Sequence, residues 1–258
     1  MRAPYFAGHA TFAGLIFCVV LAGCATTSGE RASPDDPLEP LNRAVFNANA
    51  AMDEAFIRPI AEGYRKVVPQ FIRDRVRSFI NNLTEPRIFA NDLLQGRGDA
   101  AGITFNRFFI NSTVGLGGLF DLAAQTGLQM QSGDFGQTLY TWGVGDGPYL
   151  VLLFFGPSNL RDAFGLGVDL FTTPPGVFLP GHAGVVIGFT VGTVDGMDLR
   201  SRNIESLDEI KASALDYYSH LKSIAQQRRA AELREGRGGP QEPPELIDPG
   251  TSAVEPAK

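Results

Sequence analysis

Side chains able to do nucleophilic, acid–base or metal chemistry are scarce in this chain. It contains two cysteines and three histidines. Two of the histidines, His182 and His220, lie far apart, the first in an uncharged stretch and the second in a polar one. No G-x-S-x-G, G-x-G-x-x-G or H-E-x-x-H pattern is present, so the usual motifs for acyl transfer, dinucleotide binding and zinc hydrolysis are missing. The sequence therefore predicts a protein that is not an enzyme and that uses no cofactor and no metal.

The cysteine with a clear chemical role is Cys24. Residues 1–23 have one early positive charge, an apolar run and small residues at the end, as in a secretory signal peptide. The end of this segment and the residue after it, Leu21-Ala22-Gly23-Cys24, resemble the bacterial lipobox, in which the cysteine thiol is acylated. We expect removal of residues 1–23 and lipidation of Cys24; the alternative is an ordinary signal peptide with a chance cysteine. Ala25, where aspartate usually means retention at the inner membrane, favours the outer membrane.

Composition limits the remaining classes. The formal net charge of −6 and the pI near 5.1 argue against a nucleic-acid partner, which normally requires a basic surface. The chain has 19 phenylalanines but only 6 tyrosines, although tyrosine tolerates water better, and this ratio suggests apolar surface turned towards something other than the protein's own core. We divide the mature chain into a tether at 24–35, one folded domain at 36–235 and a disordered Pro/Gly-rich tail at 236–258.

Helical patterns dominate the folded domain. Apolar residues at 72, 76, 79, 80 and 83 follow one face of a 3.6-residue repeat and predict a helix over 71–83. Residues 52–67 are also predicted to be helical, with Pro59 kinking or restarting the helix. Asp99 is expected to cap a helix that runs to Asn111, and 205–234 is expected to form one long helix.

The middle of the chain has a different character. Residues 139–155 combine glycines with a short apolar run and predict a short hairpin or a buried strand. Residues 170–194 carry no charge over 25 positions, which is long enough to span a bilayer, but three prolines interrupt them. Short helical pieces bent into or along a membrane fit this segment better than one straight helix.

Two further features suggest contact with lipid. Residues 58–77 hold six basic and two acidic side chains beside an apolar face, and Arg65, Lys66, Arg73 and Arg77 are candidates for binding lipid phosphates. The alternative is a solvated helix face. Gly143 and Gly145, next to Trp142, could form a hinge flanked by interfacial aromatics or a tight turn in a rigid core.

Many short motifs in one order resemble the MlaA (VacJ) family of outer-membrane lipoproteins, over roughly 36–230. The matching stretches are Asp36-Pro37-Leu38-Glu39, Asn42-Arg43, Arg58-Pro59, Asn82-Leu83, Glu85-Pro86, Leu93-Leu94-Gln95-Gly96, Arg107-Phe108-Phe109-Ile110-Asn111-Ser112, Gly115-Leu116-Gly117-Gly118, Phe135-Gly136-Gln137-Thr138-Leu139, Trp142-Gly143-Val144-Gly145, Gly147-Pro148-Tyr149 and Leu160-Arg161-Asp162.

The resemblance implies an all-α fold: a ring of amphipathic helices embedded in one membrane leaflet, with a short hairpin or loop near a central channel. Misplaced outer-leaflet phospholipids would leave through the channel to a soluble periplasmic lipid carrier (MlaC-like), and a trimeric porin would be a partner. Gly143 and Gly145 match the family's hinge glycines, and Asn47 and Ala48 match a site lining the channel. The family's late Asp-Pro-Tyr is Asp216-Tyr217-Tyr218 here, which predicts an uninterrupted C-terminal helix. A structural lipoprotein that scaffolds porins without moving lipid is the alternative.

Overall fold

The computed structural model describes residues 36–173 and 182–236. The predicted signal peptide at 1–23, Cys24 with its tether, and nearly all of the predicted tail lie outside the described residues, as do the prolines that interrupt the uncharged segment. Within the described part the chain is mostly helical, and the predicted all-α class is confirmed.

The elements follow one another along the chain with short connections. The helices are α2 (Glu39–Met52), the π-helix η1 (Asp53–Ile57), α3 (Arg58–Val67), α4 (Gln70–Leu94), α5 (Gly98–Thr113), α6 (Leu122–Gln125), α7 (Phe135–Thr141), α8 (Leu160–Thr172), α10 (His182–Arg202), α11 (Ile204–Ser213) and α12 (Tyr217–Gly236). The strands β1 (Tyr149–Leu152) and β2 (Gly156–Asn159) pair antiparallel, with Tyr149 opposite Asn159 and Leu152 opposite Gly156.

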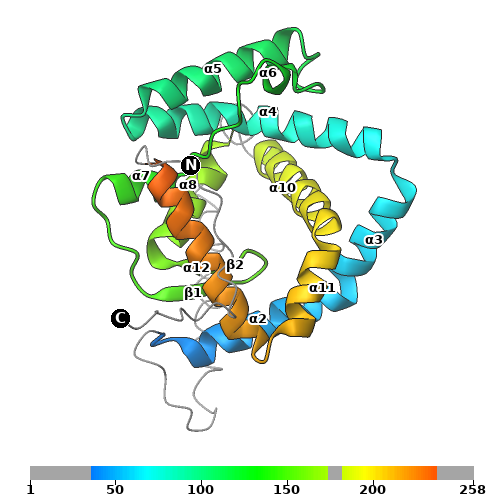
Figure 1. Cartoon of the computed structure of the whole chain (residues 1–258), viewed down its shortest axis with the longest axis vertical. Helices are drawn as coiled ribbons and strands as arrows, with labels where there is room; N and C mark the ends of the chain where they lie inside the picture. Colours follow the sequence, from blue (N-terminus) through cyan, green and yellow to red (C-terminus); the bar gives the residue numbers. More distant parts are fainter. Residues whose placement is uncertain (1–35, 174–181, 237–258) are drawn as a thin grey trace, which may run out of the picture.

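The helices are laid out as a ring (Figure 1). Helices α2, α3 and α4 form consecutive sides, and α12 returns past the hairpin towards α7 and α8. Helix α5 packs along α4, and α10 packs against α3 and α4. This arrangement agrees with the predicted ring of helices with a short hairpin.

Burial in this ring is the reverse of that in a typical soluble protein. Among the described residues, the largest fully buried side chains are all polar or charged, and the three largest are Arg107, Gln137 and Glu85. Large apolar side chains are instead exposed along several helices, for example Phe105 (53%), Phe171 (79%) and Phe189 (77%). Large apolar side chains exposed on several helices are typical of a surface that contacts a membrane or a partner.

A small apolar core joins α2 to α12. It consists of Phe46, Tyr149, Val151 and Tyr218, which come from α2, β1 and α12. The ring of Phe46 meets that of Tyr218 edge to face at a centroid distance of 5.4 Å. This cluster fixes the hairpin against α2 and α12.

No helix in residues 36–173 and 182–236 has both the length and the apolar character required for a membrane crossing. The uncharged stretch contributes the end of α8 and the first half of α10. In that half of α10, Val186 and Ile187 are exposed as well as Phe189.

Two predicted details are wrong. The helix expected over 205–234 is two helices, because Ala214 is extended and Asp216 starts a new one: its carboxylate accepts from the Tyr218 backbone N–H at 3.1 Å. Asp99 does not cap α5, whose N-cap position is Arg97; it lies in the first turn, where a negative charge still suits the helix dipole. The sequence predicts that Pro59 kinks or restarts the helix, and the restart is confirmed, since α3 begins at Arg58 directly after the π-helical turn.

Candidate functional site

The glycine-rich loop between α7 and β1 is fixed at its start by a helix cap. Gly143 has φ +92°, its N–H donates to the Tyr140 carbonyl at 3.0 Å, and the Val144 N–H donates to the Leu139 carbonyl at 2.9 Å. These two bonds with a left-handed glycine form a Schellman motif, which ends α7. A Cβ added at Gly145 would meet nothing within 4 Å. Gly143 therefore has a structural role in the cap, and the hinge role of both glycines stays a prediction.

Asparagines of α2 brace the hairpin that follows this loop. Asn42 donates to the Tyr149 carbonyl at 3.0 Å and accepts from the Val151 N–H at 2.9 Å. Asn49 does the same two turns later, with the Leu152 carbonyl at 2.9 Å and the Phe154 N–H at 3.0 Å. Since each side chain both donates and accepts, the pair sets the register of α2 along the hairpin.

The bracing role of these asparagines was not predicted, although their spacing of seven residues, two helical turns, was a usable signal. Two of the residues between them, Asn47 and Ala48, were predicted to line a channel instead. Asn47 and Ala48 are exposed on α2, away from the braced edge. Their role in lining a channel stays a prediction.

The four basic candidates do not share one exposed face. Lys66 is exposed, and Arg65 bonds Glu205 at 2.6 Å. Arg73 is only 8% exposed, and Arg77 is held by Asp198 at 2.9 Å. The hydrogen bond that Arg77 donates to Asp198 raises the pKa of Arg77 above its ordinary value. Contact of these four side chains with headgroups stays a prediction; Arg73 is buried and Arg77 is partly exposed.

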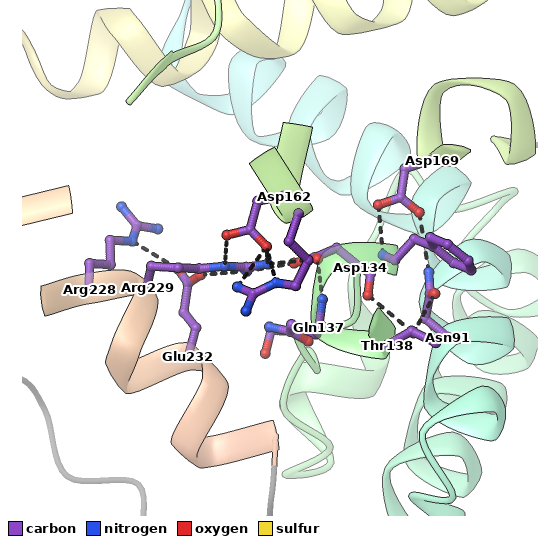
Figure 2. Close-up of polar contacts among 12 residues, drawn as sticks. Asn91, Asp134, Gln137, Thr138, Asp162, Asp169, Arg228, Arg229 and Glu232 are labelled. Atoms are coloured by element: carbon purple, nitrogen blue, oxygen red, sulfur yellow. Dashed lines mark hydrogen bonds and ion pairs between the residues drawn. The ribbon is translucent and has the colours of Figure 1, made fainter. Parts of the chain in front are cut away.

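A polar cluster joins α12 to the helices that carry the glycine loop (Figure 2). Arg229 donates two hydrogen bonds to Asp134, at 2.7 and 2.9 Å, and two to Asp162, at 2.9 and 2.8 Å. The same aspartates stand near the beginnings of α7 and α8, and Asp134 also caps α7 through the Gln137 N–H at 2.8 Å. Burial raises the pKa of Asp162, but the bonds from Arg229 outweigh it and hold that pKa below its usual value. The Arg229 guanidinium thus connects α12 to the starts of α7 and α8.

A second part of the cluster ties α4 to α7 and α8. Thr138 donates to Asn91 at 2.8 Å, Asn91 donates to Asp169 at 3.3 Å, and Asp169 accepts from the Phe135 N–H at 3.0 Å (Figure 2). The Trp142 indole N–H also donates to the Leu94 carbonyl at 3.1 Å. The glycine loop therefore leaves from a corner that is fixed to α4 on one side and to α12 on the other.

This polar interior has no arrangement typical of metal chemistry. In the part of the chain that the structure describes, no group of three or more His, Cys, Asp and Glu side chains could hold a metal ion. Its carboxylates are committed to arginines, amides and helix N-termini, which suits a framework that is polar inside and apolar outside.

Comparison with known proteins identifies the family. The family model described as "MlaA lipoprotein" matches residues 34–232. The chain is 33% identical over 231 residues to the intermembrane phospholipid transport system lipoprotein MlaA of Escherichia coli (strain K12), covering 87% of this chain and 89% of that protein. It is 31% identical over 230 residues to the protein of the same name from Haemophilus influenzae, covering 86% and 90%.

A solved structure from work on the structural basis for maintenance of bacterial outer membrane lipid asymmetry has the same fold. It superposes with a TM-score of 0.68 at 32% sequence identity and covers 77% of this chain and 98% of the solved chain. With a family model over most of its length, relatives across nearly all of it and this shared architecture, the chain belongs to the MlaA lipoprotein family.

Proposed function

We propose that this protein is an outer-membrane lipoprotein that removes mislocalised phospholipids from the outer leaflet and hands them to a soluble periplasmic lipid carrier, and so maintains lipid asymmetry. Its relatives are named as lipoproteins of an intermembrane phospholipid transport system. The observation that carries the proposal is the reversed burial, with charged side chains inside the ring framework and phenylalanines on its surface.

The reversed burial suits the energetics of lipid movement. Each CH₂ transferred from lipid to water costs about 0.8 kcal/mol, so exposing two acyl chains would cost tens of kcal/mol. A transport path must keep the chains against apolar surface and the headgroup against polar groups throughout. A ring that presents phenylalanines to the leaflet and holds polar side chains within can provide both.

We place the protein in the periplasmic leaflet, anchored through acylated Cys24. The exposed side chains at the tip of the hairpin, Leu153, Phe154 and Phe155, support contact of this face with acyl chains. A trimeric porin and the periplasmic carrier are the proposed protein partners. We expect no bond-making chemistry, because movement of an intact lipid requires none.

A strain that lacks the gene tests the function. We expect phospholipid to accumulate in the outer leaflet and sensitivity to detergent to rise, with both restored by the intact gene. Unchanged outer-leaflet phospholipid in that strain would contradict the proposed transport.

The glycine loop gives a test of the hinge. Gly145→Val, and more severely Gly143→Pro, should impair transport towards the level of the deletion strain, because the first restricts a backbone with open surroundings and the second cannot adopt φ +92°. The measurement is outer-leaflet phospholipid in complemented cells, with protein abundance and porin association near normal.

The control for the hinge is Gly102→Val, at another glycine that has nothing within 4 Å of an added Cβ. It should complement fully. Normal transport by Gly145→Val would show that the loop does not move during the cycle.

A further inference from the structure

A cavity lies at the corner of the ring where α2, η1 and α3 meet β2 and the helices α10, α11 and α12. Its volume is about 190 Å³. One part of its wall is apolar, with Phe46, Leu207 and Leu221 among the lining residues. The other part is charged, so the cavity is amphipathic.

Three ion pairs make up the charged wall. Arg200 grips Asp53 in a bidentate contact at 2.7 and 2.8 Å, with its side chain only 10% exposed. The other two pairs are more open: Arg58 with Asp208 at 2.7 Å and Lys211 with Glu54 at 3.3 Å. All six of these side chains line the cavity, which therefore holds three cations and three carboxylates.

These ion pairs leave polar groups available to bind a ligand. Arg200 Nη1 is buried and has no hydrogen-bond partner in the described part of the chain. The side chains of Lys211 and Glu54 are 53% and 70% exposed, and such exposed pairs contribute little to stability, so a ligand can replace them at little cost. Asp53 and Glu54 also stand on the π-helical turn η1, and such turns occur frequently at functional sites.

The size of the cavity limits what fits. A single water requires roughly 10–15 Å³ on the same measure, so 190 Å³ accepts a compact group of several non-hydrogen atoms. It is below the roughly 300–1,000 Å³ of pockets that enclose a whole drug-sized ligand. A headgroup fits inside, and acyl chains do not.

We propose that this cavity binds the zwitterionic headgroup of a phospholipid, a phosphate beside a primary ammonium, as in a phosphatidylethanolamine. The phosphate accepts from the guanidinium and ammonium donors, and the lipid ammonium donates to Asp208 and Glu54. The equal number of cations and carboxylates favours a zwitterion over an anionic lipid. The acyl chains lie outside, over the exposed apolar residues of η1 and α3, Phe56 and Ile60. This inference rests on the proposed function and names the substrate class.

The experiment measures binding to the purified full-length lipoprotein in detergent. Calorimetry would follow titration with dihexanoyl phosphatidylethanolamine, dihexanoyl phosphatidylglycerol, glycerophosphoethanolamine and inorganic phosphate. We expect the short-chain phosphatidylethanolamine to bind most tightly. Lys211→Glu adds a negative charge at the exposed mouth and should weaken that binding about tenfold, the size of one lost charge-assisted hydrogen bond.

A second variant and a matched control keep the result clear. Arg58→Gln should weaken binding in the same direction without adding a charge. Arg228→Glu changes an exposed cation that pairs with Glu232 on α12, outside the cavity lining, and should leave binding unchanged. A folded Lys211→Glu or Arg58→Gln variant with wild-type affinity would overturn the assignment.

The other ligands separate the possible sources of the phosphate. Equal binding of inorganic phosphate would show a free-phosphate site, and tighter binding of phosphatidylglycerol would show a site for anionic lipid; either result overturns the proposal. The proposed transport is judged separately by the deletion strain. If that strain accumulates outer-leaflet phospholipid while Lys211→Glu binds normally, only the cavity assignment fails.

Discussion

Replacing Arg107 with methionine is expected to lower the free energy of unfolding by about 3–5 kcal/mol, the cost typical of breaking a buried ion pair on one side. Arg107 and Glu85 are 1% and 0% exposed, and their side chains meet at 2.7 Å between α5 and α4. The arginine also donates to Asp121 at 3.0 Å and to the Leu128 carbonyl at 2.6 Å. The variant would leave the Glu85 carboxylate and the Leu128 carbonyl without this donor, and it would remove one of the donors to Asp121.

The measurement is urea unfolding in detergent, followed by circular dichroism. The exposed pair Arg228–Glu232 supplies the control, since Arg228→Met should cost no more than about 1 kcal/mol. The double variant Glu85→Gln with Arg107→Met should recover part of the loss, because it removes the uncompensated charge. If Arg107→Met unfolds at the wild-type urea concentration, the buried pair has no part in stability.

Acid should partly rescue the same variant. Burial already raises the pKa of Glu85, and Arg107 opposes that rise. Without Arg107 the folded-state pKa rises further above the unfolded value, so the folded protein holds the proton more tightly. Stability then increases as the pH falls through that window, and the deficit of Arg107→Met should be smaller at about pH 5 than at about pH 8. A deficit that grows on acidification would have the wrong sign.

The sequence predicts helices well where one apolar face repeats, and less well where they end. The helix expected over 71–83 exists but runs from Gln70 to Leu94, past Pro86. Tertiary packing explains the extension, because α5 packs along α4 and buries Glu85, Ile88 and Asp92 beyond the apolar repeat. The break at Asp216 was missed because a single side-chain cap, which is a local feature, leaves little trace in the periodicity of apolar residues.

The interior of the ring was harder to predict because the usual rule is reversed. Periodicity assigns apolar residues to the core, yet Phe105 and Phe109 of α5 are exposed, while Arg107 between them is buried. The sequence did indicate the reversal indirectly, through its excess of phenylalanine and its uncharged segment. The sequence could not predict which charged residues form ion pairs, because the partners are distant along the chain: Arg200 and Asp53 are 147 residues apart.

In the glycine loop, too, the sequence predicts the local elements better than their long-range contacts. The sequence locates Gly143 and Gly145 and predicts a short hairpin or a buried strand over 139–155, but the second strand, Gly156–Asn159, has no alternating apolar pattern and lies beyond that range. The first strand and the tip of the hairpin are held by Asn42 and Asn49 of a distant helix. The local sequence pattern therefore locates the loop, whereas long-range polar contacts determine how the hairpin beside it is held.

Gly165→Ala is expected to destabilise the protein by about 1–3 kcal/mol, as is typical of overpacking, although alanine is the better helix former. A Cβ at Gly165 in α8 would lie 2.4 Å from the Gly136 backbone nitrogen and 2.7 Å from its Cα in α7. A backbone cannot yield as a flexible side chain can, so α7 and α8 must separate. Their separation would pull Asp134 and Asp162 out of register with Arg229.

Gly167→Ala, two residues along the same helix, provides the matched control. A Cβ there meets nothing within 4 Å, so this variant should gain up to about 1 kcal/mol from helix propensity alone. Urea unfolding of the two proteins in the same detergent should therefore shift in opposite directions. A Gly165→Ala protein as stable as Gly167→Ala would show that the α7–α8 crossing is loose. It would also show that this corner does not hold the glycine loop rigidly at its base.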